Sequence, residues 1–529
     1  MPYAIDFGTT NTIVARWQKD SQRPEVVTLA GVSQVLSPDL ALIPSLVYVE
    51  DAARPQILIG QAVVDQGLEN RSGNRLFQTF KRGIGANIQG FMPELDGVTI
   101  SFEQVGTWFL EQILGQLYGD GVADSLVLTV PVDSFEAYRR WLTSVCQGWA
   151  AQQIYLLDEP TAAALGYDQS QANLILVLDF GGGTIDFSLV RLNSSSESKT
   201  GSGFLLKWRN IKSTNLNPKA KVSQVVAKAG MALGGSDIDQ WLLQYFCQTL
   251  GLKPSRMLLR LGERLKIALT DAEKATEFYF DAQSLESYEL HLSRAQLATI
   301  LEEQGWFQQC AELLDQVLQQ GRQQGIQPPD IEAVLLVGGT SQMPLLQDWL
   351  RQYFTTEQIF CHNPLTAVAL GGLKVLQGQQ VSDYIYHSYG VRYWNRRQNC
   401  HSWHTIIKAG QPYPMTEPVE LTLGASLDHQ PSIELLIGEL GANSGATEVY
   451  FDGDRLLSRL VTAENLVVQT LNDGPGASTI ARLDPPGKPG GDRLKVQFWV
   501  DENRYLRLTV TDLLTEKILL NNQQVAQLS

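Results

Sequence analysis

The clearest alternation of hydrophobic and polar residues in the chain surrounds a run of three glycines, Gly181 to Gly183. The residues before it, 174–178, are all apolar and lead to Asp179. After Thr184, every second position from 185 to 189 is apolar. Alternation with a period of two on both sides of a glycine turn predicts a strand, a tight turn and a second strand.

This glycine turn has the composition of an anion cradle. Consecutive glycines allow positive φ angles and bring backbone N–H groups close to a ligand, and such a nest suits phosphate. The hydroxyl of Thr184 adds a donor, and the carboxylate of Asp179 can hold a hydrated Mg²⁺. The turn is not a Walker A loop, because no Lys-Ser/Thr pair follows and a strand comes next instead of a helix. On these residues alone, an ordinary glycine hairpin explains the stretch about as well.

The N-terminus repeats the same design. Apolar residues lead to Asp6, Phe7 and Gly8, then to Thr9 and Thr10, after which the alternation resumes. Two copies of this pattern, about 170 residues apart, predict a duplicated fold whose phosphate turns face one cleft.

A third glycine turn, within residues 334–344, also follows an apolar strand and is expected at the other end of a nucleotide. The Asp-Phe-Gly of a protein kinase would occur once, beside an HRD catalytic loop that this sequence lacks. The three turns together therefore predict a nucleotide-binding protein.

Five further segments resemble motifs of one known superfamily and follow each other in its order. They are LTVPVDSFEAYRR around Pro131, LLDEPTAAALGY at 156–167, LGGSDID at 233–239, GERLKIALT at 262–270 and HNPLTAVALGG at 362–372. On these motifs the chain resembles the actin-like ATPases and, among them, the seventy-kilodalton heat-shock (DnaK-type) chaperones. The resemblance implies an α/β fold with two actin-like lobes around a nucleotide cleft, followed by an antiparallel β domain.

The resemblance also implies where the domains divide. The expected parts are a nucleotide-binding domain at 1–377 (lobe I about 1–172, lobe II about 173–377), a linker at 378–388, and a β domain at 389–529. The last part is similar to the chaperones' substrate-binding domain and leaves no room for the helical lid that follows it in the family.

Matched motif by motif, the resemblance gives individual residues roles in ATP hydrolysis. Mg²⁺ would be held through water by Asp6 and Asp179. The catalytic residues would be Glu159, Asp179, Thr184 and Asp186. The phosphates would be bound by Gly8, Thr9, Thr10, Asn11, Gly181, Gly182, Gly183 and Thr184. The nucleoside end would be lined by Gly234, Gly235, Glu263, Lys266, Thr270, Gly338, Gly339 and Thr340. Pro131 and Arg139 would relay the state of the cleft to the second domain.

One departure from the family concerns its catalytic lysine. Residues 60–85 resemble the segment that supplies it, but aligned from Gly60 the position of the lysine falls on Val64. Neither Lys81 nor Arg82 is expected to replace it. A lost charged hydrogen bond to phosphate is worth roughly 1.5–3 kcal/mol, or about ten- to a hundredfold in rate.

Two more departures concern the residues that flank adenine and the linker between the domains. Ile267 and Gln342 stand where the family has basic residues that flank adenine, and the linker keeps only Val381, Asp383 and Tyr384 of the family's pattern. Nucleotide binding is therefore expected more firmly than hydrolysis, and hydrolysis more firmly than coupling between the domains.

Composition narrows the class of partner and the compartment. The net charge of −15 argues against a nucleic-acid-binding protein. No apolar run approaches the roughly 18 residues of a membrane span, and the N-terminus has no basic region like that of a signal peptide. The five cysteines lack metal-ligand spacing and are typical of reduced thiols, so a cytoplasmic, monomeric protein is expected.

Three smaller patterns complete the predictions. Residues 193–228 form a basic insertion, which is either a solvated loop or a docking site for an acidic partner. Ser293 and Gln296 have the form of a capping box that opens a long helix. In the β domain, Ile433 and Leu435 alternate with a glutamate and face either a peptide groove or the sandwich core.

Three functions compete. The first is an ATP-binding, weakly ATP-hydrolysing chaperone that binds unfolded or apolar polypeptide segments, with a co-chaperone or nucleotide-exchange factor as a further partner. The second is a nucleotide-gated binding or scaffold protein with little turnover. The third, a sugar kinase of the same superfamily, is disfavoured because a kinase would not need the β domain.

Overall fold

The computed structural model describes the chain apart from a set of short segments and the last residue. The residues not described are 19–22, 72, 86–87, 91, 119–124, 132–137, 139–140, 143–144, 147–152, 168–171, 194–204, 208–221, 282–283, 377–384, 386–387, 396–399, 409–410, 412, 416, 443–445, 453–454, 462–466, 473–478, 502–503 and 529. The chain forms two compact units, one of Met1–Ser198, Gly203–Val381 and Thr447–Leu460, the other of Lys199–Ser202, Ser382–Ala446 and Val461–Ser529.

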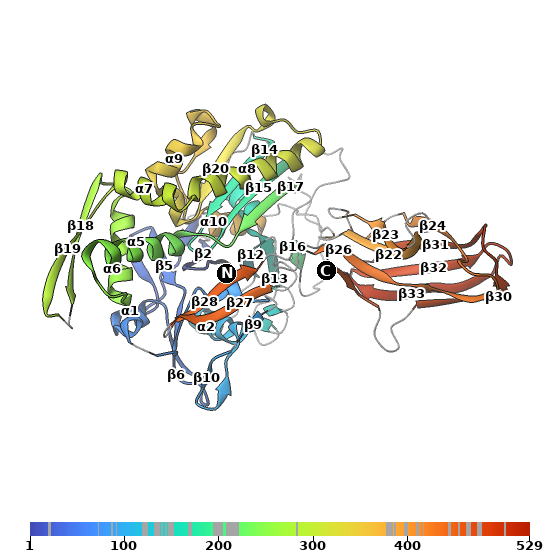
Figure 1. Cartoon of the computed structure of the whole chain (residues 1–529), viewed down its shortest axis with the longest axis horizontal. Helices are drawn as coiled ribbons and strands as arrows, with labels where there is room; N and C mark the ends of the chain where they lie inside the picture. Colours follow the sequence, from blue (N-terminus) through green and yellow to red (C-terminus); the bar gives the residue numbers. More distant parts are fainter. Residues whose placement is uncertain are drawn as a thin grey trace. The chain divides into compact units, whose positions relative to one another are not determined.

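An eight-stranded sheet is the centre of lobe I (Figure 1). Its strands are β1 (Pro2–Phe7), β2 (Asn11–Gln18), β3 (Arg23–Val26), β4 (Gln34–Ser37), β5 (Leu40–Pro44), β12 (Ser125–Val130), β13 (Gln153–Asp158) and β16 (Leu205–Lys207). They run in the order β16-β13-β12-β1-β2-β5-β4, with β3 beside β2. β1 is antiparallel to β2 and parallel to β12, which is parallel to β13.

The sheet of lobe II repeats this arrangement. Its strands are β14 (Leu174–Phe180), β15 (Ile185–Asn193), β17 (Val222–Met231), β20 (Ala333–Val337) and β21 (Ile359–Phe360), in the order β17-β15-β14-β20-β21. β14 is antiparallel to β15 and parallel to β20, which is parallel to β21. Each lobe therefore starts with a hairpin whose first strand pairs with a parallel strand, and the predicted duplicated α/β fold is confirmed.

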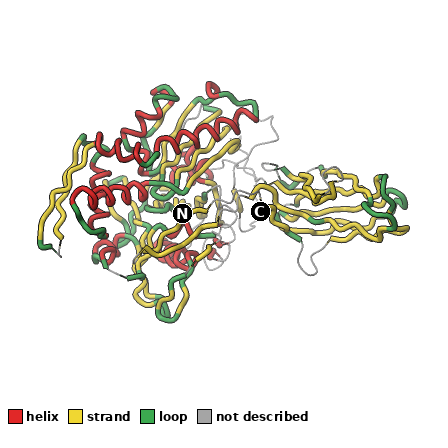
Figure 2. The backbone as a smooth tube through the Cα atoms, viewed as in Figure 1, coloured by secondary structure: helices red, strands yellow, loops and turns green. Residues whose placement is uncertain are grey.

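Helices cover the sheets of both lobes (Figure 2). They are α1 (Gln61–Asp65), α2 (Phe102–Tyr118), α4 (Glu159–Gly166), α5 (Gly235–Leu250), α6 (Arg256–Ala268), α7 (Arg294–Glu303), α8 (Trp306–Gln323), α9 (Pro344–Leu350) and α10 (Ala367–Val375). Two of them, α4 and α10, touch backbone to backbone. A Cβ added at Gly166 would lie 1.9 Å from the carbonyl oxygen of Ala367, and one at Gly371 would lie 1.8 Å from that of Ala162. Only glycine permits this approach.

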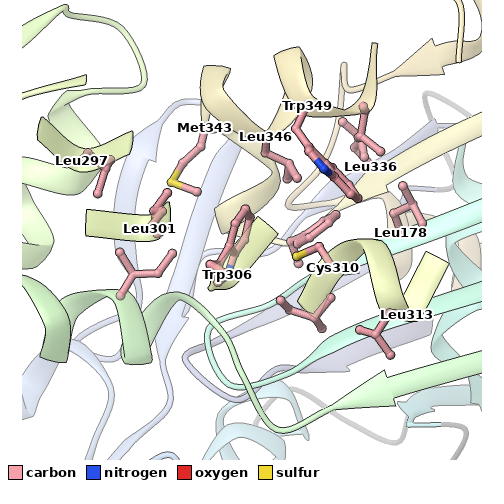
Figure 3. Close-up of a cluster of buried hydrophobic side chains, with 14 of the residues drawn as sticks. Leu178, Leu297, Leu301, Trp306, Cys310, Leu313, Leu336, Met343, Leu346 and Trp349 are labelled. Atoms are coloured by element: carbon pink, nitrogen blue, oxygen red, sulfur yellow. The ribbon is translucent and has the colours of Figure 1, made fainter. Parts of the chain in front are cut away.

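The core of lobe II lies between its sheet and helices α5 to α9, and Figure 3 shows the part to which α7 to α9 contribute. Leu178 and Leu336 from the sheet meet Trp306 and Cys310 of α8, all of them buried. The predicted capping box at the start of α7 is confirmed, since Ser293 and Gln296 cap each other. The single long helix expected there is wrong. The backbone of Gly305 has φ 66°, a left-handed conformation that ends one helix and starts the next.

Several short elements complete the first unit. They are β6 (Leu46–Asp51), β7 (Gln56–Ile59), β8 (Leu76–Gln78), β9 (Ile88–Gly90), β10 (Glu94–Leu95), β11 (Val98–Thr99), β18 (Lys274–Asp281), β19 (Glu286–Ser293), β27 (Ala446–Asp452), β28 (Arg455–Val461) and the 3₁₀ turns η1 (Leu68–Asn70), η2 (Phe80–Gly83), η3 (Pro328–Asp330), η4 (Gly339–Gln342) and η5 (Thr356–Gln358). β27 pairs in parallel with β9, so residues 447–460 belong to this unit although the sequence suggested the β domain.

The second unit consists of antiparallel strands. They are β22 (Ser388–Asn395), β23 (Cys400–Ile407), β24 (Val419–Gly424), β25 (Gln430–Leu435), β26 (Ile437–Ala442), β29 (Val467–Thr470), β30 (Thr479–Gly487), β31 (Asp492–Val500), β32 (Tyr505–Asp512) and β33 (Ile518–Gln527). Between β25 and β26, the side chain of Asn472 bonds to the N–H of Ile437 at 2.8 Å and to the carbonyl of Leu435 at 2.9 Å. This amide replaces ladder bonds where the chain changes sheets.

Some predictions fall outside the described residues. These are the relay residue Arg139, most of the basic insertion, and the linker residues Val381, Asp383 and Tyr384. Among the helices that the structure describes, none combines the length and apolar character needed to cross a bilayer.

Candidate functional site

The phosphate turns of the two lobes lie against each other. A Cβ at Gly182 would fall 1.6 Å from the hydroxyl oxygen of Thr10, and one at Gly183 would fall 2.4 Å from Cγ2 of Thr9. The turns therefore meet as the duplicated pattern predicted, and glycine is required in lobe II because the threonines of lobe I fill the space.

The second turn presents unused hydrogen-bond donors. Across the described residues, the backbone N–H groups of Gly182, Gly183 and Thr184 donate to no protein acceptor, and the same holds for Thr9 and Thr10. The turn itself is closed by a bond of 3.0 Å from the N–H of Gly181 to the carbonyl of Thr184. Successive free N–H groups in a turn are the donor set that binds phosphate.

A cavity of about 410 Å³ lies beside these turns. Of the residues predicted for the nucleotide and metal, it is lined by Asp6, Gly8, Thr9, Thr10, Asn11, Glu159, Asp179, Gly181, Gly182, Thr184, Gly235, Glu263, Lys266, Thr270, Gly338, Gly339 and Thr340. The two predicted glycines outside this lining are adjacent to it. Gly183 continues the turn, and a Cβ at Gly234 would lie 2.7 Å from the backbone of Gly182.

Four ionisable groups gather near the ends of β1 and β14: the buried Lys81 and three partly buried carboxylates, Asp6, Glu159 and Asp179. The amine of Lys81 lies 2.7 Å from a carboxylate oxygen of Glu159, and the hydroxyl of Thr129 lies 2.9 Å from Asp6. Burial, together with the charge of Glu159, raises the pKa of Asp6 to about 7. Burial and the neighbouring Glu159 raise the pKa of Asp179 well above its usual range. Ionising all three carboxylates beside this amine is therefore unfavourable unless a further cation is bound.

Lys81 corrects the prediction about the missing lysine. Its side chain is 8% exposed, and its carbonyl accepts a bond of 2.8 Å from the hydroxyl of Tyr138. Burial alone would lower the pKa of the amine, but the charges of Glu159 and Asp6 outweigh burial and raise it, so the amine stays protonated. Val64 lies on α1, outside the cavity lining. The sequence placed the lysine position at Val64 and expected no replacement by Lys81, but Lys81 is the residue that lines the cavity.

The donor set fits magnesium held through water. Asp6 and Asp179 are each the second-last residue of equivalent strands in the two lobes, and both line the cavity. Among the described residues, no group of three or more His, Cys, Asp or Glu side chains could hold a metal directly. Mg²⁺ usually keeps several waters and needs only one or two carboxylates, so these two suffice.

The other predicted catalytic residue and the relay proline line a second, smaller cavity. Its volume is about 20 Å³, and Pro131, Asp186 and Lys228 line it together with Glu159 and Asp179. That volume accommodates roughly one water molecule. Lys228 was noticed in the sequence only as part of a basic run. Lys228 on β17 pairs with Ser188, which lies two residues beyond Asp186 on β15, so Lys228 lies beside the carboxylates.

At the nucleoside end, Lys266 is held in place by its neighbours. Its amine lies 2.7 Å from Asp239 and donates a bond of 2.9 Å to the carbonyl of Gly235. Burial raises the pKa of Asp239 to about 7. Ile267 and Gln342 line the cavity here, as the sequence suggested.

Apolar side chains that the motifs did not mark line part of the same cavity. They are Ile13, Leu36, Leu40, Leu42, Met343, Leu365 and Val368. The continuous apolar run at 40–43 was the available signal, but such a run is equally typical of a buried core strand. The cavity thus joins a polar, charged end to an apolar wall, which suits a molecule that carries phosphates and a flat ring.

In the second unit, the structure buries both candidate groove residues. Ile433 and Leu435 belong to the hydrophobic core with Phe498 and Leu508. This placement agrees with the alternative that they are sandwich core.

Comparison with known proteins shows which families this chain resembles. The family model described as Hsp70 protein matches residues 217–389, and the one described as MreB/Mbl protein matches residues 39–200. The chain is a divergent member of the actin-like ATPase superfamily.

Within that superfamily the curated relatives are chaperones. The chain is similar to the chaperone protein DnaK of Thermotoga petrophila, with 27% identity over 69% of this chain and 57% of the relative. It is 23% identical to DnaK of Thermosipho melanesiensis, over 97% of this chain and 78% of that protein. A chaperone protein HscA homolog of Pasteurella multocida is 25% identical, over 69% of this chain and 56% of the relative. The alignment with the Thermotoga relative thus spans a little over half of that protein's length.

Proposed function

We propose that the first unit binds Mg²⁺–ATP and hydrolyses ATP slowly, and that the chain is a cytoplasmic, chaperone-like protein that binds unfolded or apolar polypeptide segments. The observation that supports this most strongly is one cavity that joins free N–H donors of the glycine turn to Asp6, Asp179 and Lys81. The named relatives, DnaK and an HscA homolog, are chaperones.

In the proposed in-line transfer of a phosphoryl group to water, each group of residues has a separate role. Bound Mg²⁺ would neutralise charge on the phosphate oxygens. The N–H groups of Gly182, Gly183 and Thr184 orient the terminal phosphates, and the amine of Lys81 stabilises charge that develops there. Glu159 holds this amine and, with Asp186, lines the small cavity in which one water fits. Catalysis of this reaction consists mainly of such positioning and charge stabilisation.

A second candidate function is a nucleotide-gated binding or scaffold protein with little turnover. Two observations favour it. Ile433 and Leu435 are buried in the core instead of facing a groove, and aliphatic Ile267 and neutral Gln342 line the cavity where the family has basic residues. Co-chaperones or exchange factors are proposed as partners under either function.

Single-turnover hydrolysis of ATP separates the two. The chaperone-like ATPase should release phosphate in the presence of Mg²⁺, and Thr184→Ala should slow it, because the hydroxyl and its turn are disturbed. A labelled apolar peptide, followed by fluorescence anisotropy with ATP and with ADP, tests polypeptide binding. Tight nucleotide binding without phosphate release would favour the scaffold, and absence of nucleotide binding would refute both.

A further inference from the structure

All three carbonyl groups of the glycine turn are held by residues outside the turn. The carbonyl of Gly181 accepts bonds from the N–H of Gly235 at 3.0 Å and from the hydroxyl of Thr340 at 3.1 Å. The carbonyl of Gly182 accepts a bond of 2.8 Å from the N–H of Ser236. The carbonyl of Gly183 accepts a bond from the guanidinium of Arg82.

These bonds determine where the phosphate donors of the turn point. In a trans peptide group, the C=O bond and the N–H bond of the next residue lie in one plane and point in opposite directions. Holding the carbonyls of residues 181, 182 and 183 therefore directs the N–H groups of Gly182, Gly183 and Thr184 to the opposite side. Those are the groups without a protein acceptor among the described residues.

Arg82 is the member of this set that comes from the other lobe. Gly235, Ser236 and Thr340 belong to lobe II, whereas Arg82 lies on η2 of lobe I, 101 residues before Gly183. Its guanidinium also donates to Asp237 at 2.9 Å, and the same carboxylate oxygen accepts a bond of 2.7 Å from the N–H of Gly234. The side chain is 12% exposed. Charge-assisted bonds in such a setting are stronger than neutral ones.

Arg82 touches the turn from behind, away from the ligand space. It is not among the residues that line the large cavity, although its sequence neighbour Lys81 is. A Cβ added at Gly183 would lie 2.8 Å from Nε of Arg82, so the guanidinium is packed against the turn. Its influence on a bound phosphate therefore passes through the Gly183 peptide.

We propose that Arg82 is a positioning residue that fixes the Gly183 peptide and makes the phosphate turn complete only when the two lobes are together. The inference rests on the proposed nucleotide binding of this cavity. It states that one side chain, Arg82, couples closure of the lobes to phosphate binding. Phosphates beyond the α-phosphate benefit from the fixed turn, whereas the nucleoside does not.

A matched pair of variants separates positioning from simple attachment of the lobes. Arg82→Met removes the guanidinium from the turn. Arg260→Met removes another ion pair between the lobes, the one with Glu69, which has no contact with the turn. Arg82→Lys keeps a charged donor and should restore part of the effect.

Calorimetric titration with Mg²⁺–ATP and with adenosine gives the first result. Arg82→Met should weaken Mg²⁺–ATP binding by about tenfold or more, the value of one charge-assisted hydrogen bond, and leave adenosine binding unchanged. Arg260→Met should change both by less than about twofold. Equal losses in the two variants, or equal losses for ATP and adenosine, would overturn the proposal.

Hydrogen exchange of the nucleotide-free protein gives a second result that needs no ligand. If Arg82 fixes the turn, the amides of Gly235 and Ser236, which donate to the turn, should exchange about tenfold faster in Arg82→Met and not in Arg260→Met. Unchanged exchange would overturn the proposal. Faster exchange together with a wild-type protein that does not bind ATP would support the positioning role and refute the proposed function instead.

Discussion

At the scale of single residues, the chemistry of the cavity depends on a balance of charge. Asp6, Asp179 and Glu159, all partly buried, lie close to the buried amine of Lys81. The carboxylates keep the amine protonated, because their charges outweigh the effect of burial on its pKa. The amine in turn limits the repulsion among the carboxylates, so each group sets the protonation state of the others.

Lys81→Met tests the role of this amine. Single-turnover hydrolysis should fall about ten- to a hundredfold, the value of a charged hydrogen bond to phosphate. Nucleotide should still bind, because the N–H donors of the turn remain. Val64→Lys is the matched control, since Val64 lies on α1 outside the cavity lining, and it should leave turnover unchanged. A rise in turnover with Val64→Lys would instead support the prediction that the lysine position falls on Val64.

At the scale of elements, the two turns fit together because Thr9 and Thr10 of lobe I leave no room for a side chain at Gly182 and Gly183 of lobe II. Gly182→Ala would place a Cβ 1.6 Å from the hydroxyl of Thr10. Relieving that overlap moves the turns apart, and overpacking of this kind costs about 1–3 kcal/mol. Mg²⁺–ATP binding measured by calorimetry should weaken by about tenfold or more. Gly115→Ala is a control in which the added Cβ meets no atom within 4 Å, and it should leave binding intact. Equal binding by Gly182→Ala and wild type would contradict the paired turns.

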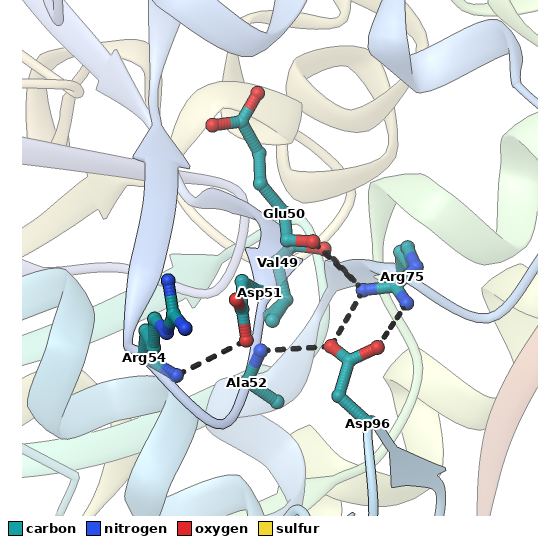
Figure 4. Close-up of polar contacts among 7 residues, drawn as sticks. All are labelled: Val49, Glu50, Asp51, Ala52, Arg54, Arg75 and Asp96. Carbon is teal, nitrogen blue, oxygen red and sulfur yellow. Dashed lines mark hydrogen bonds and ion pairs between the residues drawn. The ribbon is translucent and has the colours of Figure 1, made fainter.

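A second element-scale feature ties the β10–β11 hairpin to β6 in lobe I (Figure 4). The guanidinium of Arg75 bonds to both carboxylate oxygens of Asp96, at 2.6 and 3.0 Å, and to the carbonyl of Glu50 at 3.0 Å. The N–H of Ala52 also donates to Asp96, at 2.9 Å. The bonds from Arg75, then that from Ala52, lower the pKa of Asp96 to about 2.

This clamp predicts a defined pH dependence. A carboxyl with a lowered pKa in the folded state stabilises the fold above its unfolded pKa of about 3.9, and the contribution disappears as the pH falls through about 2. Asp96→Asn should therefore unfold at a lower urea concentration than wild type at pH 7, and the gap should close between pH 4 and pH 2. Asp51→Asn, which removes a carboxylate that bonds to the N–H of Arg54, should produce a smaller gap. A gap for Asp96→Asn that stays constant down to pH 2 would refute the clamp.

At the scale of the whole molecule, local hydrophobic patterns predicted the strands correctly, whereas the position of the lysine and the length of a helix were predicted wrongly. The period-two alternation after Thr184 predicted one face for Ile185 and Phe187 and the other for Asp186, because side chains of a strand alternate between faces. In the structure the first two lie in the core and Asp186 lines the small cavity. The position of Lys81 in the cavity was not predicted, because it depends on how the short elements α1, η1 and β8 between Gly60 and Lys81 fold. The long helix after Ser293 was wrong because a left-handed Gly305 divides it, and such a conformation is not visible in a hydrophobic pattern.

Contacts between distant segments were the part that the sequence did not reveal. Arg82 and Gly183 are far apart in the chain, and nothing near Arg82 indicates that its guanidinium reaches a carbonyl of the other lobe. The apolar wall with Leu36 and Leu365 likewise forms only when both lobes are in place. Motifs thus predicted many of the residues that line the cavity, and the tertiary structure adds the contacts that hold them in place.

The central claim is that Asp6 and Asp179 make the cavity a Mg²⁺-dependent ATP site. Isothermal titration calorimetry of the whole chain with ATP, with and without Mg²⁺, tests it most directly, with Asp179→Asn as the variant. We expect saturable binding of one ATP in Mg²⁺ that weakens by about tenfold or more when Mg²⁺ is removed or Asp179 is neutralised. Absence of ATP binding by the wild-type chain, or an affinity that neither change alters, would contradict the account.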